Sequence, residues 1–592
     1  MLAHDNLIWL LDGAMGTQLQ QLQLMSTSVP EAVNLTHPDA IRDIHRAYIQ
    51  AGARIIYANT FSVNGYKLAD SDYTVRQLVS AAVQNAKNAR QLENPDVLIA
   101  LDCGPIGRML EPNGDLAFTE AYELFQELVT AGVEAGVDLI LFETFTDLLE
   151  IKAAILAAKE YSNLPVFASM SFESNGRTFA GVTPASAALT LSGLGVDALG
   201  INCSLGPEQI LPLVEELAAW TNLPLLVKPN AGLPDVETGL FNLDPETFAA
   251  ITVRFADLGV KYIGGCCGTT PAHLHMLGKR LAGKTVQPRK WVARTALCSA
   301  ETVVEVDRVR IVGERINPTG KKRFKAALEN HDIPYILSQA LEQTEAGAEI
   351  LDVNLGIPSI DEAALMREVV PALQSVTSAP LQIDSSDPAA IEAALRVYNG
   401  KALVNSVNGD RKNLEQLLPI VKKYGAAVIG LTLNEKGLPK NAKERVEIAK
   451  EILAAAEAFG IPREDVIIDC LTLTVSAQQD QALETLAAVK TVRQQLGLHT
   501  VLGVSNISFG LPDRETINTA FLTMALVNGL DLAIMNPNNR AMTGAVRAFN
   551  VLANRDINSE EFIRTRSDVV AKTVAPESQI SLDYAIENGL KQ

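Results

Sequence analysis

The feature that most constrains this chain is a repeated alternation between helix-period segments and short aliphatic runs that end in polar residues. Runs that are apolar on both faces are typical of buried parallel strands, and the glycines before many of them suit left-handed helix caps. The first half contains eight such runs, at residues 8–13, 53–60, 97–104, 137–144, 165–172, 196–203, 224–230 and 260–267. The pattern restarts near residue 306 with eight more, at residues 309–317, 348–354, 380–386, 401–406, 426–434, 466–470, 500–506 and 531–537.

Eight strands alternating with helices predict a (β/α)8 barrel, and two copies of about 250 residues account for the length of the chain. We therefore predict an α/β fold with two tandem TIM barrels. Open doubly wound sheets are the weaker interpretation, because neither half contains their Gly-x-Gly-x-x-Gly turn or a P-loop. The expected domains are a first barrel over 1–285, a linker over 286–305, a second barrel over 306–560 and a tail over 561–592.

The composition limits the partners that such a chain can have. The 50 basic and 69 acidic residues give a net charge of −19, which argues against nucleic acid as a partner. No run of about 18 apolar residues could span a membrane, and the N-terminus lacks the basic flank of a secretion signal. Six cysteines are too few for a disulfide scaffold of this size. We expect a cytoplasmic protein.

Three cysteines fall where barrel enzymes place their chemistry, at the carboxyl ends of strands. Cys203 ends the sixth run, and the vicinal pair Cys266 and Cys267 ends the eighth. Vicinal residues of an extended strand point to opposite faces, but the flanking glycines would let the backbone turn and bring both sulfurs together. Three thiolates on Zn²⁺ would leave one tetrahedral position open, as in catalytic sites, and that position suits a thiol substrate.

The other three cysteines have simpler interpretations. Cys298 and Cys470 are expected to be small buried residues of the core. Cys103 lies near the end of the third run, at the same end of the barrel as the predicted ligands, so it could be mistaken for one of them.

Two acidic residues and a glycine-rich turn accompany the cysteines in the first half. Asp12 and Glu143 are the next-to-last residues of the first and fourth runs, where either carboxylate could receive an amino group. The backbone amides of the turn at 13–17 could bind a carboxylate. A helix cap for Asp12 and a solvated loop for Glu143 are the structural alternatives.

The strand ends of the second half carry carboxylates and carboxamides without histidine or a cysteine cluster, which disfavours a metal. The candidates are Glu314, Asn317, Asn354, Asp384, Asn405, Asp469 and Asn506. One carboxylate can accept both the ring N–H and the exocyclic amine of a flat heterocycle such as a pterin. The alternative is that Asn and Asp are common wherever strands turn into loops.

Four motifs of the first half resemble the homocysteine S-methyltransferase family: Asp12-Gly-Ala-Met-Gly-Thr, Gly200-Ile-Asn-Cys-Ser, Lys228-Pro-Asn-Ala-Gly and Gly264-Gly-Cys-Cys-Gly-Thr-Thr. This resemblance implies a zinc site of Cys203, Cys266 and Cys267 that binds homocysteine. It also implies a homocysteine site of Asp12, Gly13, Glu143, Asn202 and Asn230. Asp12 and Glu143 would lie near the amino group, and Asn230 would hold the open zinc position when substrate is absent.

The second half resembles the pterin-binding methyltransferases in an ordered series of motifs: Gly313-Glu-Arg-Ile-Asn-Pro-Thr-Gly, Asp352-Val-Asn, Ile383-Asp-Ser-Ser, Asn405-Ser, Ile468-Asp-Cys and Gly503-Val-Ser-Asn-Ile-Ser-Phe-Gly-Leu-Pro-Asp-Arg. The resemblance implies that Asp384, Asn405 and Asp469 hold the pterin of methyltetrahydrofolate. Asn506 would act near N5, which carries the methyl group. A tertiary amine must gain a proton or a strong hydrogen bond before the methyl group leaves, and the sequence does not identify the proton source.

The order of the two halves resembles the N-terminal half of the cobalamin-dependent methionine synthase family, in which a corrinoid carries the methyl group from folate to homocysteine. The seven histidines offer no Asp-x-His-x-x-Gly motif for a corrinoid domain. Residues 581–589 resemble the first helix of the cap that precedes such domains. We therefore expect a missing domain or a separate protein to supply cobalamin.

Two alternatives remain open from the sequence. One is a corrinoid-independent thiol methyltransferase that uses a small sulfonium or betaine donor and has a silent second barrel. The other is a folate-binding or scaffold protein without catalysis.

Overall fold

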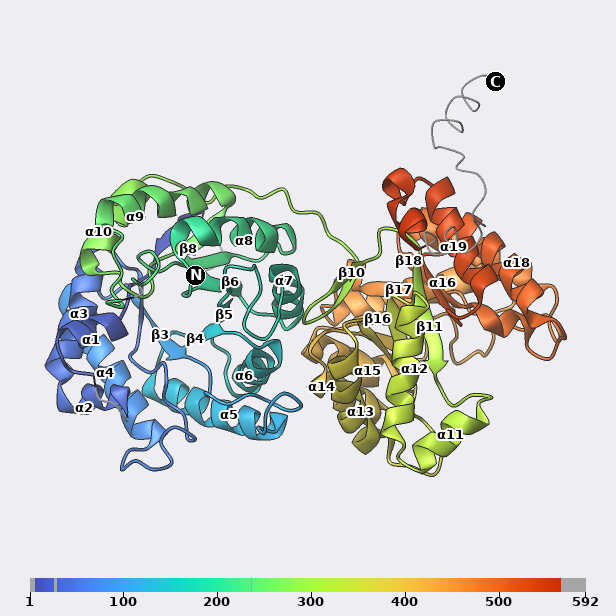
Figure 1. Ribbon diagram of the computed structural model, residues 1–592, viewed down its shortest axis with the longest axis horizontal. Helices are drawn as coiled ribbons and strands as arrows, with labels where there is room; N and C mark the ends of the chain where they lie inside the picture. Colours follow the sequence, from blue (N-terminus) through green and yellow to red (C-terminus); the bar gives the residue numbers. More distant parts are fainter. Residues whose placement is uncertain (1–5, 26–28, 236, 566–592) are drawn as a thin grey trace, which may run out of the picture.

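The computed structural model describes residues 6–25, 29–235 and 237–565, and it contains two eight-stranded α/β barrels side by side (Figure 1). Every one of the sixteen predicted runs overlaps a barrel strand, so the predicted fold is confirmed. The residues 581–589 that resemble a cap helix lie outside the described residues.

The first barrel consists of parallel strands in the order β1-β8-β7-β6-β5-β4-β3-β2, and a bridge between Leu11 and Ile55 closes it. Its strands are β1 (Trp9–Leu10), β2 (Ile55–Tyr57), β3 (Leu98–Cys103), β4 (Leu139–Phe145), β5 (Val166–Met170), β6 (Ala198–Asn202), β7 (Leu225–Lys228) and β8 (Val260–Ile263). Its α-helices are α1 (Gly16–Gln21), α2 (Val33–Thr36), α3 (Pro38–Gln50), α4 (Val75–Glu93), α5 (Phe118–Ala135), α6 (Leu148–Tyr161), α7 (Pro184–Gly193), α8 (Pro207–Ala219), α9 (Pro245–Thr252) and α10 (Pro271–Leu281).

The second barrel is closed by strand pairing throughout. Its strands are β11 (Arg310–Ile316), β12 (Ile350–Val353), β13 (Leu381–Asp384), β15 (Leu403–Asn408), β16 (Ala427–Leu431), β17 (Val466–Asp469), β18 (His499–Gly503) and β19 (Leu532–Met535). Its α-helices are α11 (Lys322–Glu329), α12 (Ile333–Glu345), α13 (Glu362–Val376), α14 (Pro388–Val397), α15 (Arg411–Tyr424), α16 (Ala442–Ala458), α17 (Gln481–Thr491), α18 (Arg514–Val527) and α19 (Arg540–Leu552).

A hairpin of β9 (Ala296–Ser299) and β10 (Val303–Glu305) joins the barrels, and β14 (Gly400–Lys401) extends it to three strands. Its residues Leu297 and Val304 pack with the interior side chains of the second barrel. Cys298, on the opposite face of β9, packs against Leu189 of α7. The connection between the barrels therefore packs into the interior of the second barrel on one face and against α7 of the first on the other.

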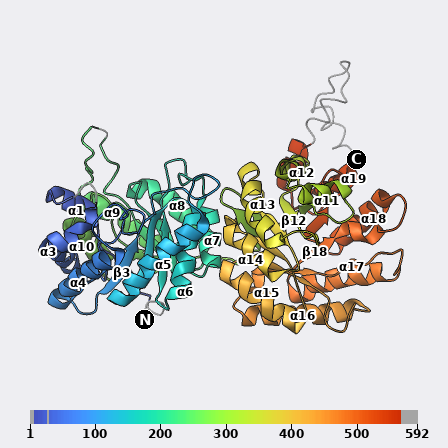
Figure 2. The same cartoon turned by 90° about the horizontal axis from the view of Figure 1, so that it is seen from below.

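The barrels also contact each other directly, with α6 and α7 of the first near α14 of the second (Figure 2). The fully buried Lys152 on α6 donates hydrogen bonds to the carbonyl oxygens of Leu395 and Tyr398, the latter at 2.9 Å. Glu160 at the end of α6 forms an ion pair of 3.0 Å with Lys423 of α15. Lys152 thus satisfies two carbonyls at the end of α14 across the domain boundary.

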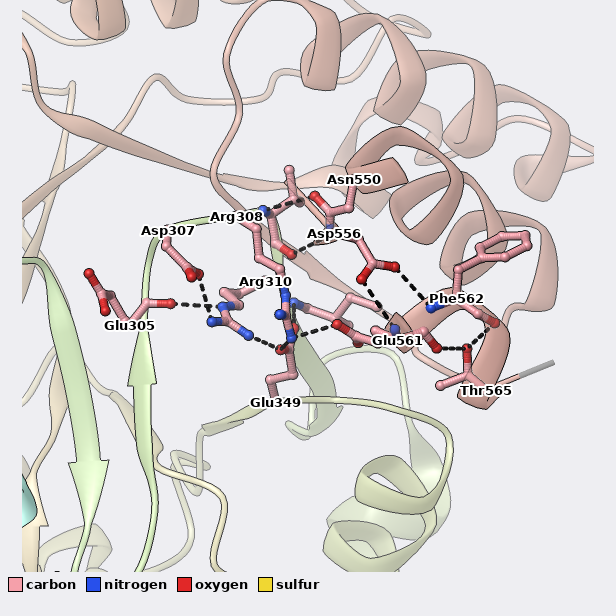
Figure 3. A network of polar contacts seen from close by, with 12 residues as sticks. Glu305, Asp307, Arg308, Arg310, Glu349, Asn550, Asp556, Glu561, Phe562 and Thr565 are labelled. Carbon is pink, nitrogen blue, oxygen red and sulfur yellow. Dashed lines mark hydrogen bonds and ion pairs between the residues drawn. The ribbon is translucent and has the colours of Figure 1, made fainter. Parts of the chain in front are cut away.

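A polar network ties the end of the described chain to the second barrel (Figure 3). Arg308, just before β11, lies 2.5 Å from Glu561 and 3.2 Å from Glu349. The carboxylate of Asp556 accepts the backbone N–H groups of Glu561 and Phe562 at 3.1 and 2.9 Å. The helical turn over 560–565 is thus held beside the start of β11.

None of the helices within the described ranges is long and apolar enough to cross a membrane.

Candidate active site

The two-residue period of the strands selects which side chains enter the first barrel. The interior core includes Ala100, Leu141 and Leu226. Two residues further along the same strands, Asp102, Glu143 and Lys228 continue on that inner face, and all three line a cavity of about 480 Å³ at the carboxyl ends of the strands. The site therefore occupies the position expected for a barrel enzyme.

The three predicted cysteine ligands converge at this cavity. Their sulfurs all lie within 4.8 Å of one another, and Cys203 Sγ is 3.8 Å from Cys267 Sγ. Two sulfurs bound at about 2.3 Å to a tetrahedral Zn²⁺ would lie about 3.8 Å apart, so spacing and donor type fit this ion. The thiols of Cys266 and Cys267 hydrogen-bond to Cys203 and lower its pKa to about 3, which makes it the first thiolate of the cluster.

The two glycines before the cysteine pair let the backbone after β8 lie closer to its neighbours than any residue with a Cβ would allow. A Cβ on Gly264 would lie 2.7 Å from Leu11 Cβ, and one on Gly265 would lie 2.5 Å from Thr269 Cγ2. Gly265 donates its N–H to the carbonyl of Asp12 at 3.2 Å. This approach brings the turn after β8 against β1 and aims both following sulfurs at Cys203.

The side chains of the two predicted asparagines, Asn202 and Asn230, accept hydrogen bonds from backbone N–H groups next to the site. Asn230 accepts the N–H of Cys267 at 3.1 Å and its side chain also hydrogen-bonds to Cys203. Asn202 is fully buried and does not line the cavity. It accepts the N–H of Thr144 at 2.8 Å and donates to Thr144 Oγ1 at 2.7 Å, which fixes the residue after Glu143.

Asp12 and Glu143 both line the cavity, and a lysine lies between them. Lys228 Nζ is 3.1 Å from Asp12 Oδ1, 3.8 Å from Glu143 Oε2 and 3.4 Å from the centre of the Tyr57 ring. Burial raises the pKa of Glu143 to about 7, although Lys228 opposes the shift. The sequence interpretation did not select Lys228, Tyr57 or Asp102, although strand alternation places all three on the inner face.

Gly13 and the rest of the turn at 13–17 line the same cavity. A Cβ on Gly13 would lie 2.7 Å from the ring of Tyr48, so only glycine fits there. The remaining cysteines, Cys103, Cys298 and Cys470, are fully buried, as predicted for the latter two. Cys103 neighbours Asp102 on β3 and therefore points away from the cavity, toward the surrounding helices.

The second barrel has a cavity of about 600 Å³ at the corresponding strand ends. Six of the seven predicted residues line it: Glu314, Asn317, Asp384, Asn405, Asp469 and Asn506. The seventh, Asn354, donates to Asp384 Oδ2 at 3.1 Å, and Asn317 donates to the same oxygen at 3.4 Å. The structure thus brings all seven together around Asp384 and Asp469.

Burial makes the carboxylates of this cavity weak acids. It raises the pKa of Asp384 and of Asp469 to about 6 each, and only a hydrogen bond from the N–H of Leu471, at 2.7 Å, opposes the shift at Asp469. Burial also raises the pKa of Glu314, which accepts a hydrogen bond from Ser505 Oγ at 3.1 Å. Groups of this kind are poised to exchange protons with a heterocycle near neutral pH.

Several cavity residues were not predicted. Asp352, two residues before Asn354 on the same face, accepts hydrogen bonds from Gln382 at 2.6 Å and Asn405 at 3.4 Å. Arg514 donates to the carbonyl of Ser505 at 2.7 Å and so supports the loop of Asn506. Strand alternation could have identified Asp352, whereas Arg514 is the first residue of α18 and, although it ends a motif of the sequence, its contact with Ser505 is set by the fold.

Two protein families match the chain, one in each barrel. Residues 9–281 match the family described as homocysteine S-methyltransferase, and residues 313–536 match the family described as pterin binding enzyme.

Two curated relatives match most of the chain. The methionine synthase of Mycobacterium tuberculosis (strain ATCC 25618 / H37Rv) is 32% identical over 560 residues, and that of Mycobacterium leprae (strain TN) is 31% identical over 565. Each match covers 89% of this chain and 47% of the relative, so the chain spans about half the length of these relatives.

Solved structures match the single barrels. The metallated form of the homocysteine methyltransferase MmuM from Escherichia coli is 28% identical, with a TM-score of 0.41, and the match covers 46% of this chain and 96% of that one. Dihydropteroate synthase from Stenotrophomonas maltophilia is 19% identical, with a TM-score of 0.35, over 44% of this chain and 98% of that one.

Proposed function

We propose that this chain carries out the two methyl transfers of methionine synthesis, because it joins a homocysteine S-methyltransferase domain to a pterin-binding domain. The methyl group of 5-methyltetrahydrofolate passes from N5 to a corrinoid in the second barrel. The methylated corrinoid then serves as the methyl donor to homocysteine in the first barrel, which yields methionine. A further domain or a separate protein supplies the corrinoid as a substrate to both sites.

The observation that carries the proposal is the convergence of Cys203, Cys266 and Cys267 at the mouth of the first barrel. A Zn²⁺ ion held by these sulfurs lowers the pKa of a substrate thiol, so that homocysteine is a nucleophilic thiolate at neutral pH. The chain itself contributes the geometry: Asn230 holds Cys203 and Cys267, and Gly264 and Gly265 allow the close turn.

The remaining polar groups of the first cavity bind the amino-acid end of the substrate. Asp12 and Glu143 face the ammonium group, and the turn at 13–17 faces the carboxylate. Lys228 reduces the repulsion between the two buried carboxylates, because it lies within 4 Å of both.

In the second barrel, Asp384 and Asp469 accept the N–H groups of the pterin, and Asn317, Asn354 and Asn405 complete its polar surroundings. Asn506 lies toward N5 and stabilises the developing charge by a hydrogen bond. The cavity also contains Arg315, Lys321 and Arg514, which suit the carboxylates of the glutamate tail of folate.

A two-part assay of the purified chain tests the proposal. The first part measures zinc content and methionine formed from methylcobalamin and homocysteine. The second measures demethylation of 5-methyltetrahydrofolate by reduced cobalamin. We expect about one zinc per chain and both reactions. Methionine formation from a sulfonium or betaine donor, without any corrinoid, would instead support the thiol methyltransferase with a silent second barrel.

A further inference from the structure

The first cavity contains buried polar atoms that the contacts described so far leave without a partner. Tyr57 Oη and Asp102 Oδ1 are buried and form no hydrogen bond within the described part of the chain, and Glu143 Oε2 has only the 3.8 Å ion pair with Lys228. All three residues line the same cavity. A buried carboxylate without a partner is costly, so its presence beside a cavity indicates a ligand that completes it.

Asp102 is the most informative of these residues. It is 8% exposed, and it lies on the inner face at the end of β3, next to the strand that carries Glu143. Its neighbour Asp12 is already paired with Lys228 at 3.1 Å, and Glu31 accepts hydrogen bonds from the N–H and hydroxyl of Ser62 at 2.9 and 2.6 Å. Asp102 has no comparable contact among the described residues.

The charges of the cavity point to the kind of group that is missing. Its lining residues include four carboxylates, those of Asp12, Glu31, Asp102 and Glu143, and one cation, Lys228. Lys228 is directed to Asp12 and Glu143 and not to Asp102. A ligand with an ammonium group would supply the absent positive charge next to Asp102.

We propose that Asp102 receives the α-ammonium group of the substrate, together with Glu143, and so makes the first barrel selective for thiols that are amino acids. This inference rests on the proposed function, because it places the substrate thiol at the cysteine cluster of the same cavity. Lys228 remains the resident cation beside Asp12 and Glu143, and the substrate ammonium, which those two carboxylates also face, supplies the counter-charge that Asp102 lacks.

The test compares two ligands that differ in one group: homocysteine and 4-mercaptobutanoate, which has the same thiol chain without the amino group. Their dissociation constants are measured on the zinc-loaded chain by calorimetry, and methionine formation from methylcobalamin is followed in parallel. We expect Asp102→Asn to weaken homocysteine binding about 10- to 100-fold, as for the loss of a charge-assisted contact. Its affinity for 4-mercaptobutanoate should change less than about twofold, on the same physical grounds.

Glu31→Gln is the matched control, because it removes a negative charge from the same cavity at a residue that already has partners. It should leave the preference for homocysteine intact. Equal losses for both ligands in Asp102→Asn, or equal effects of the two substitutions, would overturn the inference. So would a wild-type chain that binds both thiols equally. A wild-type chain that discriminates between them but forms no methionine would contradict the proposed function alone.

Discussion

The sulfurs of three cysteines at two strand ends lie close together because a different local contact or backbone conformation positions each cysteine. Cys203 directly follows β6 and adopts a left-handed backbone conformation with φ of 61°, and Cys267 is held by the side chain of Asn230. Cys266 donates its N–H to the carbonyl of Pro229 at 2.8 Å. The fold itself therefore sets the position of each sulfur, independently of a bound metal.

Replacement of Cys266 by serine tests this arrangement. We expect Cys266→Ser to lose zinc and the methylation of homocysteine, because a serine hydroxyl is a much poorer ligand for this ion than a thiolate. Cys103→Ser, which changes a buried thiol on the outer face of β3, should retain zinc. Metal analysis of both variants is the measurement, and retained zinc in Cys266→Ser would contradict the assignment.

Substitution of Asp384 tests the folate site of the second cavity. Asp384→Asn removes the negative charge that accepts the pterin N–H groups, so we expect methyltetrahydrofolate binding to weaken by roughly 1.5–3 kcal/mol. Transfer from methylcobalamin to homocysteine should be unchanged, since that site lies in the other barrel. A parallel loss of both activities would argue against two independent sites.

The raised pKa of Asp469 leads us to expect that this residue lowers the stability of the folded chain in a pH-dependent way. Its pKa is raised by burial from 3.8 to about 6, so without ligand it destabilises the folded chain progressively as the pH rises from about 4 to about 6. Asp469→Asn should therefore raise the free energy of unfolding by roughly 1–3 kcal/mol at pH 7.5 and by little near pH 4. Urea denaturation at the two pH values measures this, and an equal effect at both would show that the carboxylate is not responsible.

At the scale of single elements, the turn after β8 depends on the close contact between the backbone of Gly265 and the side chain of Thr269. Gly265→Ala would place a Cβ against Thr269 and displace the two cysteines that follow, so we expect reduced zinc content with an intact fold. Gly16→Ala is a suitable control, because a Cβ there meets nothing within 4 Å. Equal zinc content in the two variants would mean that the turn tolerates the extra atom.

The elements also show what the sequence could and could not predict. Apolar runs bounded by glycine predicted every barrel strand, because burial on both faces leaves a strong local pattern. The same alternation separates inward Asp102 from outward Cys103, and it could have identified Lys228 and Tyr57. Arg514 and Asn202 both lie in motifs that the sequence shows, but the contact of Arg514 with the Asn506 loop and the hydrogen bonds of Asn202 depend on three-dimensional packing and could not be predicted.

At the scale of the whole molecule, the barrels share a buried contact. Lys152→Met would leave the carbonyls of Leu395 and Tyr398 without their donor, so we expect a loss of roughly 1–3 kcal/mol in unfolding free energy. Lys159→Met on the same helix removes only a partly exposed ion pair of 3.5 Å and should cost far less. Thermal denaturation of both variants measures the difference, and equal melting temperatures would show that the contact adds no stability.

X-ray absorption spectroscopy of the zinc-loaded chain tests the central claim most directly, because it counts the sulfur atoms around the metal. The account predicts three sulfur ligands at about 2.3 Å and one lighter ligand without substrate, and four sulfurs after homocysteine is added. A zinc ion with fewer than three sulfur ligands, or a spectrum that homocysteine leaves unchanged, would contradict it.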